Sequence, residues 1–284
     1  MTVIKDIRRI YAGLNADEIR GAAYRDVNIG LMAAGEEGYR EMEQFFAPPW
    51  LGGAAQAEAL KAIHRVDGAP SRFDFVLCEP GIPLPSNGYT FHSADKEYMA
   101  RAIVADHHDL ELAVARRFPL FRKPVADKIV HRISRENALF SLVTALPNVI
   151  PSVIDLPWAI GEFATDTAFL TMNQIRMALL MAGAHGNTIG YAEQKAQIAV
   201  IAAGAFGWRA LARELVGKIP LGGGLIPKAA VAFAGTYVVG LGLEKLNRTG
   251  FGLSRAEKKD AYADAFDKGK EVVQDLAPTV TGRR

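Results

Sequence analysis

The residues best suited to chemistry follow a short apolar stretch, FDFVLCE, at 73–79. This run is typical of a buried β-strand, and Glu79, Pro80 and Gly81 stand at its end. A carboxylate at the end of a strand can bind a magnesium ion, and a glycine beside it lets the backbone approach a ligand closely. We therefore ask whether a site is built around Glu79, or whether an ordinary strand simply meets a turn.

A second apolar run, VNIGLMA at 27–33, predicts the strand that would precede a phosphate-binding loop. A working loop reads G-x-x-x-x-G-K-[ST], but here Tyr39 stands in the lysine position and Arg40 in the hydroxyl position. The loop also carries two glutamates, and a like charge near 4 Å costs about 4 kcal/mol at an effective dielectric constant of about 20. We expect no binding of GTP or ATP, and no cofactor.

The N-terminal part is predicted to be a small α/β unit. Helical segments at 34–46 and 54–63 lie between the two predicted strands, an order typical of parallel strands. We predict that VNIGLMA and FDFVLCE are parallel neighbours in one sheet, with Glu79 at its carboxyl edge. Two interpretations stay open, a plain α/β unit and a degenerate, shortened GTPase-like domain that keeps strands and turns without the chemistry.

Composition excludes several classes of function. The 284 residues are 50% hydrophobic and 23% charged, with a mean hydropathy of +0.07 and a net charge of +2. Such a small net charge favours neither nucleic acid nor an acidic partner. A single cysteine, Cys78, excludes an internal disulfide, and the N-terminus lacks the apolar core of a secretory signal. We expect a cytoplasmic protein whose cysteine is a buried strand residue.

The second half of the chain is predicted to be helical and apolar. Between Ala138 and Ala203 only six residues are charged. Glycine-rich helices are predicted at 162–186, 193–218 and 226–246, and a capping box of Ser254 and Glu257 predicts a charged terminal helix. The predicted fold is mainly α with a small N-terminal α/β unit and a helical-bundle C-terminal domain. Its predicted segments are the α/β domain at 1–103, a helical linker at 104–136, the apolar helical domain at 137–252 and the charged helix at 253–284.

Polar residues on one apolar helix are the candidates for a structural or interaction role. Asp166 and Asn173 are seven residues apart and share a helix face, and Arg176 follows one turn later. We expect a buried polar stripe that holds helices in register. Its acid, Asp166, should pair with Arg209 or Arg213 of the next helix, or with Arg176 of a neighbouring copy in a homo-oligomer.

Neither a metal site nor a membrane span is clearly encoded. Adjacent histidines such as His107 and His108 point about 100° apart on a helix, so one metal ion cannot easily bind both. The charge-free run at 229–243 extends about 22 Å as a helix, against a hydrocarbon core of about 30 Å. The apolar helices therefore either bury one another in a water-soluble bundle or form short hairpins that dip into one leaflet.

Five stretches between Arg117 and Leu246, with their immediate flanks, resemble one bacterial family. They are ARRFPLFR, NALFSLVTALPNVIP, TDTAFLTMNQIRMALLMAGAHG, AFGWRALARELVGKIP and AVAFAGTYVVGLG. This half of the chain is similar to the YcjF-like family, GTPase-associated bacterial proteins of unknown function that are often described as membrane proteins. Members are often fused or genetically linked to GTPase domains, and the family has no established catalytic residues.

The resemblance implies a non-enzymatic interaction or membrane-associated module that acts beside a GTPase or another protein partner. It would work in the cytoplasm or at the inner face of the cell membrane. Two alternatives stay open. One is a lipid-binding or pore-like helical protein, and the other is an enzyme with an unrecognised pocket.

Overall fold

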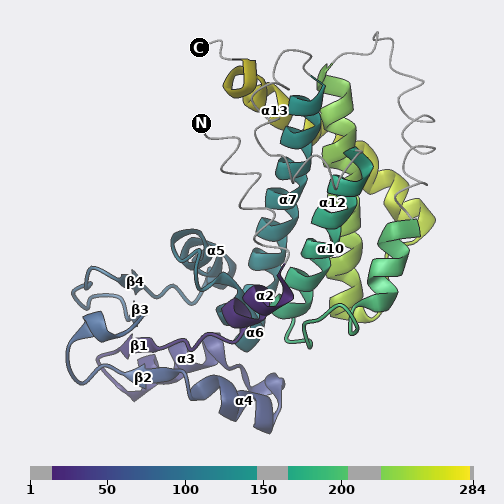
Figure 1. Cartoon of the computed structure of the whole chain (residues 1–284). Coiled ribbons are helices and arrows are strands. Elements are labelled where there is room, and N and C mark those ends of the chain that lie inside the picture. Colours follow the sequence, from purple (N-terminus) through teal and green to yellow (C-terminus); the bar gives the residue numbers. More distant parts are fainter. Residues whose placement is uncertain (1–14, 146–165, 204–224, 282–284) are drawn as a thin grey trace. The chain divides into compact units, whose positions relative to one another are not determined.

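A computed structural model of the chain describes residues 15–145, 166–203 and 225–281. The described residues are mainly helical, with one small four-stranded parallel sheet near the N-terminus, which confirms the predicted fold class (Figure 1). The chain divides into two compact units. The α/β unit comprises Arg20–Ala126 and Gly183–Asn187, and the helical unit comprises Met1–Ile19, Asp127–Ala182 and Thr188–Arg284.

The α/β unit alternates short strands with helices. In chain order its elements are α2 (Ala16–Ala23), β1 (Ile29–Met32), α3 (Glu36–Phe46), α4 (Gly53–Leu60), β2 (Ile63–Arg65), β3 (Phe75–Cys78), β4 (Gly88–Thr90), α5 (Lys96–Asp106), α6 (Glu111–Arg117) and α7 (Arg122–Thr144). The first and last of these helices, α2 and α7, are shared with the helical unit. Single 3₁₀ turns precede α4, β3 and α7 and begin at Pro49, Pro70 and Pro119.

The sheet confirms the predicted pairing of the two apolar strands. Its order is β2-β1-β3-β4 and every pair is parallel. Ile29 lies opposite Phe75 and Met32 opposite Cys78, so VNIGLMA and FDFVLCE are neighbours. The prediction missed β2 and β4, and β2 begins at Ile63, where the sequence predicted the end of a helix. A strand of three residues is too short to show an alternation of apolar and polar side chains, so the sequence pattern did not reveal these two strands.

Aromatic side chains fill the core of the α/β unit. The rings of Phe46 and Phe121 stack with their centroids 6.0 Å apart, and Phe118 lies 5.1 Å from Phe46. All three are fully buried. The sequence placed residues 104–136 in a linker, whereas the structure uses Phe118 and Phe121 as core residues of this unit. The division between the two units therefore falls inside α7, between residues 126 and 127.

The helical unit is built from long helices. They are the greater part of α7, α10 (Asp166–Ala184), a helix covering 195–203, α12 (Leu225–Thr249) and α13 (Arg255–Thr281). In the α/β unit, the side chain of Asp95 caps α5. In the helical unit, Ser254 and Glu257 form the predicted capping box at the start of α13. The backbone N–H of Ser254 donates to Glu257 Oε2 at 2.8 Å, and that of Glu257 donates to Ser254 Oγ at 3.3 Å.

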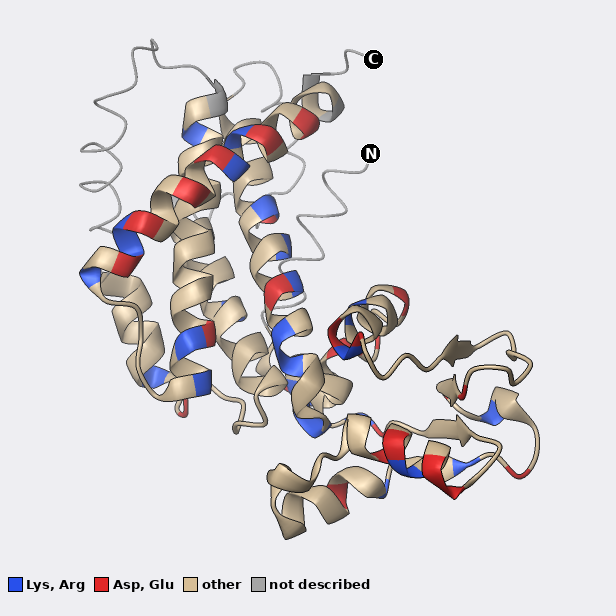
Figure 2. Cartoon of the chain, turned by 180° about the vertical axis from the view of Figure 1, so that it is seen from behind, with Lys and Arg blue, Asp and Glu red and all other residues tan. Residues whose placement is uncertain are grey.

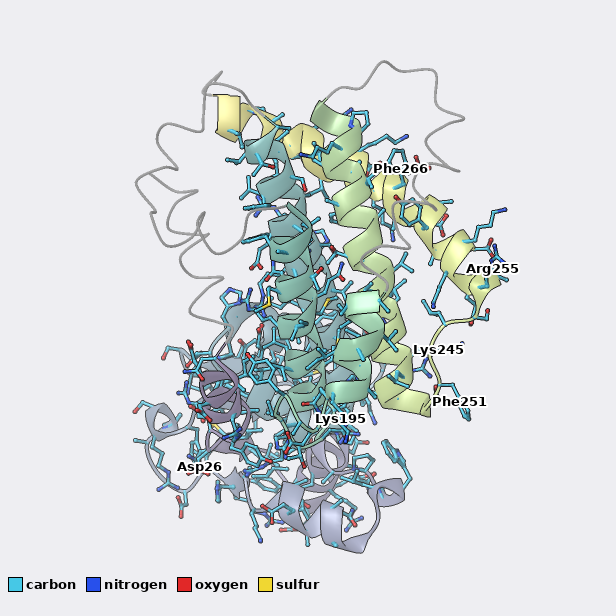
Figure 3. All side chains as sticks on the ribbon, turned by 45° about the vertical axis from the view of Figure 1, so that its right-hand side comes forward. Asp26, Lys195, Lys245, Phe251, Arg255 and Phe266 are labelled. Carbon is cyan, nitrogen blue, oxygen red and sulfur yellow. The ribbon has the colours of Figure 1, made fainter. Side chains whose placement is uncertain are left out.

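Helix α13 crosses α12 diagonally and covers one of its faces (Figure 1). Phe233 of α12 packs with Val273 and Leu276 of α13 in one apolar cluster. A second cluster joins Val238 of α12 to Phe266 of α13. Figure 3 shows Phe266 on α13, and Lys245, Phe251 and Arg255 around the turn that connects the two helices. Figure 2 shows that α13 carries charges of both signs along its length.

Two glycines let the helices approach closely. A Cβ atom added at Gly240 of α12 would lie 2.6 Å from a methyl group of Val130 on α7 and 3.1 Å from the sulfur of Met177 on α10. One added at Gly269 of α13 would lie 3.0 Å from the carbonyl oxygen of Ala230. Glycine at both positions therefore has a packing role. Gly240 lies in one of the predicted Gly-rich apolar helices, whereas Gly269 lies in the helix predicted as charged.

One described helix, at Pro227–Thr249, is long and apolar enough to cross a membrane. Its most apolar window is 61% buried inside the structure. A core helix of a soluble protein passes the same test of length and composition, so this helix is weak evidence for a membrane span.

Candidate functional sites

Glu79 lies at the position where α/β sheets usually bind ligands. Strand β1 has β2 on one side and β3 on the other, so the strand order reverses between β1 and β3. In open parallel sheets, ligands bind outside the carboxyl ends of the strands at such a reversal. Glu79 directly follows β3, and its backbone N–H donates to the carbonyl of Met32 at the end of β1 at 2.8 Å.

The carboxylate of Glu79 is bound by the loop that follows β1. The backbone N–H of Ala34 donates to Glu79 Oε2 at 2.6 Å. A Cβ atom added at Gly38, in the first turn of α3, would lie 2.7 Å from the same oxygen. An internal carboxylate thus lies against the N-terminal end of α3, where the positive end of the helix dipole favours an anion. Gly38, the one glycine that matches a phosphate loop, provides the space for this carboxylate.

The glutamate that begins α3 is also neutralised from within the unit. Arg65 of β2 donates to both carboxylate oxygens of Glu36, at 2.5 and 2.7 Å. The hydrogen bond from Arg65 lowers the pKa of Glu36. The guanidinium carbon of Arg65 also lies 4.3 Å from the centre of the Tyr39 ring. Glu36 and Tyr39, which argued against a phosphate loop in the sequence, therefore form a small cluster of their own.

The helical unit contains a buried polar cluster between α7, α10 and α12. Arg176 Nη1 donates to Glu136 Oε2 at 2.9 Å, and Asn173 Nδ2 donates to the same oxygen at 3.2 Å. Asn173 Nδ2 also donates to Asn137 Oδ1 at 2.9 Å, and Asn137 Nδ2 donates to Thr236 Oγ1 at 2.7 Å. The network thus links one residue of α12 to pairs of residues on α7 and α10.

Burial makes this cluster sensitive to the loss of any partner. Asn137 and Asn173 are fully buried, and Arg176 is 8% exposed. Burial lowers the pKa of Arg176, and the charge of Glu136 offsets part of that effect. Removing one partner of a buried ion pair typically costs several kcal/mol of stability, because the other charge is left buried and unpaired. The cluster therefore suits a device that holds three helices in one register.

The predicted polar stripe is recovered only in part. Asn173 and Arg176 lie in the cluster, but their partners Glu136 and Asn137 come from a segment predicted as the end of a linker and the start of the next domain. The side chain of Asp166, and the whole of Arg209 and Arg213, lie outside the described residues, so the pairing of Asp166 stays a prediction. The missed signal is on α7, where Ser134, Asn137 and Ser141 recur at helical spacing, and all three are buried.

The candidate metal ligands and the single cysteine of the sequence analysis lie in the part of the chain that the structure describes. No group of three or more metal-ligating side chains occurs there. Cys78 is buried, as predicted, and burial raises the pKa of its thiol, which weakens it as a nucleophile. His107 packs against Phe75 with ring centroids 5.3 Å apart.

Comparison with known proteins returned no relative. No protein-family profile matches the chain, and neither a curated protein nor a solved structure matches it significantly.

Proposed function

We propose that the chain is a non-enzymatic interaction module that works beside a protein partner. Its resemblance to the YcjF-like family makes a GTPase the first partner to test. The α/β unit serves as a scaffold in this proposal, and the helical unit supplies a bundle whose helices are held in fixed register.

The observation that carries the proposal is the position of the Glu79 carboxylate. It accepts a hydrogen bond from Ala34 N–H and lies against Gly38, at the carboxyl edge where a nucleotide phosphate would have to bind. A phosphate there would meet the negative charge of Glu79. Tyr39 and Arg40 stand where a phosphate loop has its lysine and its hydroxyl residue, so the two side chains that normally bind the phosphate and the magnesium ion are missing.

Isothermal titration calorimetry with magnesium-bound GTP and ATP tests the nucleotide part of the proposal. We expect no heat of binding in the micromolar range for the wild-type chain. Micromolar binding would contradict the proposal. The test is repeated with Arg122 replaced, because Arg122 lies outside the loop after β1, so binding that is retained in that variant belongs to the sheet edge. The Glu79→Gln variant is a useful second protein, because it removes the negative charge and keeps an acceptor for Ala34.

The partner is tested by recovering a tagged full-length chain from its own cells after chemical cross-linking. We expect GTPase activity in the recovered complex and none in the purified chain. A complex without nucleotide hydrolysis under any condition would remove the GTPase from the proposal and leave an interaction module with another partner.

Membrane association is a second candidate function, and helix α12 favours it. Pro227–Thr249 is long and apolar enough to span a bilayer. Fractionation of cells followed by a carbonate wash separates the alternatives. A chain that stays in the pellet after the wash is inserted in the membrane, whereas one released by carbonate is bound at the surface, and one in the first supernatant is a soluble adaptor.

A further inference from the structure

Two neighbouring arginines of the α/β unit, Arg116 at the end of α6 and Arg122 at the start of α7, have no acidic partner among the described residues. Arg116 uses neutral acceptors. Its Nη1 donates to the backbone oxygen of Asn187 at 2.8 Å and its Nη2 to the hydroxyl of Tyr24 at 2.6 Å. Its guanidinium also lies 3.9 Å from the centre of the Tyr24 ring. These contacts fix the position of Arg116 and leave its charge uncompensated.

Arg122 is less well satisfied than Arg116. Its side chain is partly buried, and its Nε is fully buried without a hydrogen-bond acceptor in the described structure. Burial, and next the positive charge of Arg116, lower the pKa of Arg122. A desolvated cation beside a like charge is unfavourable unless an anion joins it. No acidic residue lies in the first turn of α7, where Arg122 stands.

The surroundings of the pair leave it open to a ligand. Gly186, which follows α10, has a φ of +82° and no side chain, and Arg122 Nη2 would lie 3.8 Å from a Cβ added there. Gly186, Asn187 and Tyr24 are all solvent-exposed. A small anion can therefore reach the guanidinium groups without passing through the core.

We propose that Arg116 and Arg122 bind an oxyanion of the phosphate type. Guanidinium groups donate paired N–H bonds to phosphate oxygens, and Arg122 has donors that no acceptor in the described structure uses. Arg116 is held in place by Tyr24 and Asn187, so little side-chain ordering is needed when the anion arrives. This site lies on α6 and α7 and does not involve Glu79, so it is independent of the proposed function.

The shared chemistry is a phosphate group, and it has two sources, free phosphate and the headgroup of a phosphatidic acid. The first experiment uses inorganic phosphate. Thermal unfolding of the full-length chain is followed in phosphate and in chloride at equal ionic strength. We expect millimolar phosphate to raise the melting temperature of the wild type, and calorimetry to give a dissociation constant in the millimolar range.

Variants at Arg122 give the decisive comparison. Arg122→Gln should weaken phosphate binding by about tenfold or more, which corresponds to about 1.4 kcal/mol. The control is Arg101→Gln on α5, because Arg101 already pairs with Glu97 at 2.7 Å and is half-exposed. It should bind phosphate as the wild type does. If the wild type gains no stability from phosphate over chloride, or if Arg122→Gln binds phosphate equally well, the site does not exist.

Stability without ligand provides a second readout. Arg122→Gln removes an uncompensated charge, so we expect it to be at least as stable as the wild type in chloride. If it fails to fold, Arg122→Lys replaces it in the binding assay. That variant keeps the charge and loses the paired donors, and it should still bind phosphate more weakly. Wild-type affinity in Arg122→Lys would overturn the proposal.

Vesicles then distinguish the two sources. The chain is mixed with phosphatidylcholine vesicles that either contain or lack phosphatidic acid, and sedimentation measures the bound fraction. Binding that requires phosphatidic acid, is competed by inorganic phosphate and is lost in Arg122→Gln identifies the lipid headgroup. Phosphate binding in solution without binding to these vesicles identifies a free phosphate or phosphomonoester.

Discussion

The edge of the sheet and the interior of the helical bundle satisfy acidic side chains in different ways. At the sheet edge, Glu79 accepts from one backbone N–H and is only partly buried. In the bundle, Glu136 accepts from two side chains of another helix, and both donors are buried. Water can replace the lost contact in the first case and cannot easily do so in the second. The same residue type therefore has a local role in one unit and a role in holding helices together in the other.

The largest expected effect follows from Glu136→Ala. It leaves Arg176 as a buried and unpaired cation, which typically costs about 3–5 kcal/mol of unfolding free energy. Denaturant unfolding measures the change. The matched control is Glu97→Ala, whose exposed pair with Arg101 should contribute less than about 1 kcal/mol. Equal effects of the two variants would show that the bundle cluster is solvated and that the contrast with the surface is wrong.

A smaller loss is expected from Gly240→Ala. The new methyl group would lie 2.6 Å from Val130 and must displace α7 or α12, and overpacking of this kind costs about 1–3 kcal/mol. Gly242→Ala is the control on the same helix, because its methyl group would lie 3.9 Å from Leu253. Alanine favours helix over glycine by about 1 kcal/mol, so this variant should be neutral or more stable. A stabilising Gly240→Ala would mean that the helices are not in close contact there.

At the sheet edge, Glu79→Ala should cost about 1–2 kcal/mol through the loss of one charge-assisted hydrogen bond. Glu79→Gln should lose less, because the amide oxygen can still accept from Ala34. Hydrogen exchange at the Ala34 amide, measured by NMR, gives a direct local readout. Unchanged protection of that amide in both variants would show that Glu79 does not hold the loop.

The smallest effect concerns pH and the start of α13. Hydrogen bonds from Lys245 and then from Ser254 lower the pKa of Glu257 to about 2. Because the folded pKa lies below the ordinary value of 4.5, the stabilisation is complete above pH 4.5 and is lost as pH falls toward 2. Glu257→Gln should melt slightly below the wild type at neutral pH, and the difference should disappear near pH 2. A constant difference across this range would assign the effect to something other than the carboxylate.

The sequence predicted those parts of the fold that depend on strong local patterns. The apolar strands β1 and β3, the position of Glu79 and the capping box at Ser254 all follow from residues close together in the chain. Strands β2 and β4 were missed because three residues carry no measurable period. The ion pair of Arg176 was missed because Glu136 is forty positions away and lies in a charged segment, where one acid among many gives no sign of being buried.

The order in which the chain is synthesised gives the packing of α13 on α12 a further consequence. Helix α12 is complete about thirty residues before α13 ends, and synthesis proceeds at about 5–20 residues per second. For seconds, then, Phe233 and Val238 lack the cover that α13 provides in the folded chain. Until α13 packs on α12, the apolar face of α12 stays uncovered and can be bound by a chaperone or a membrane.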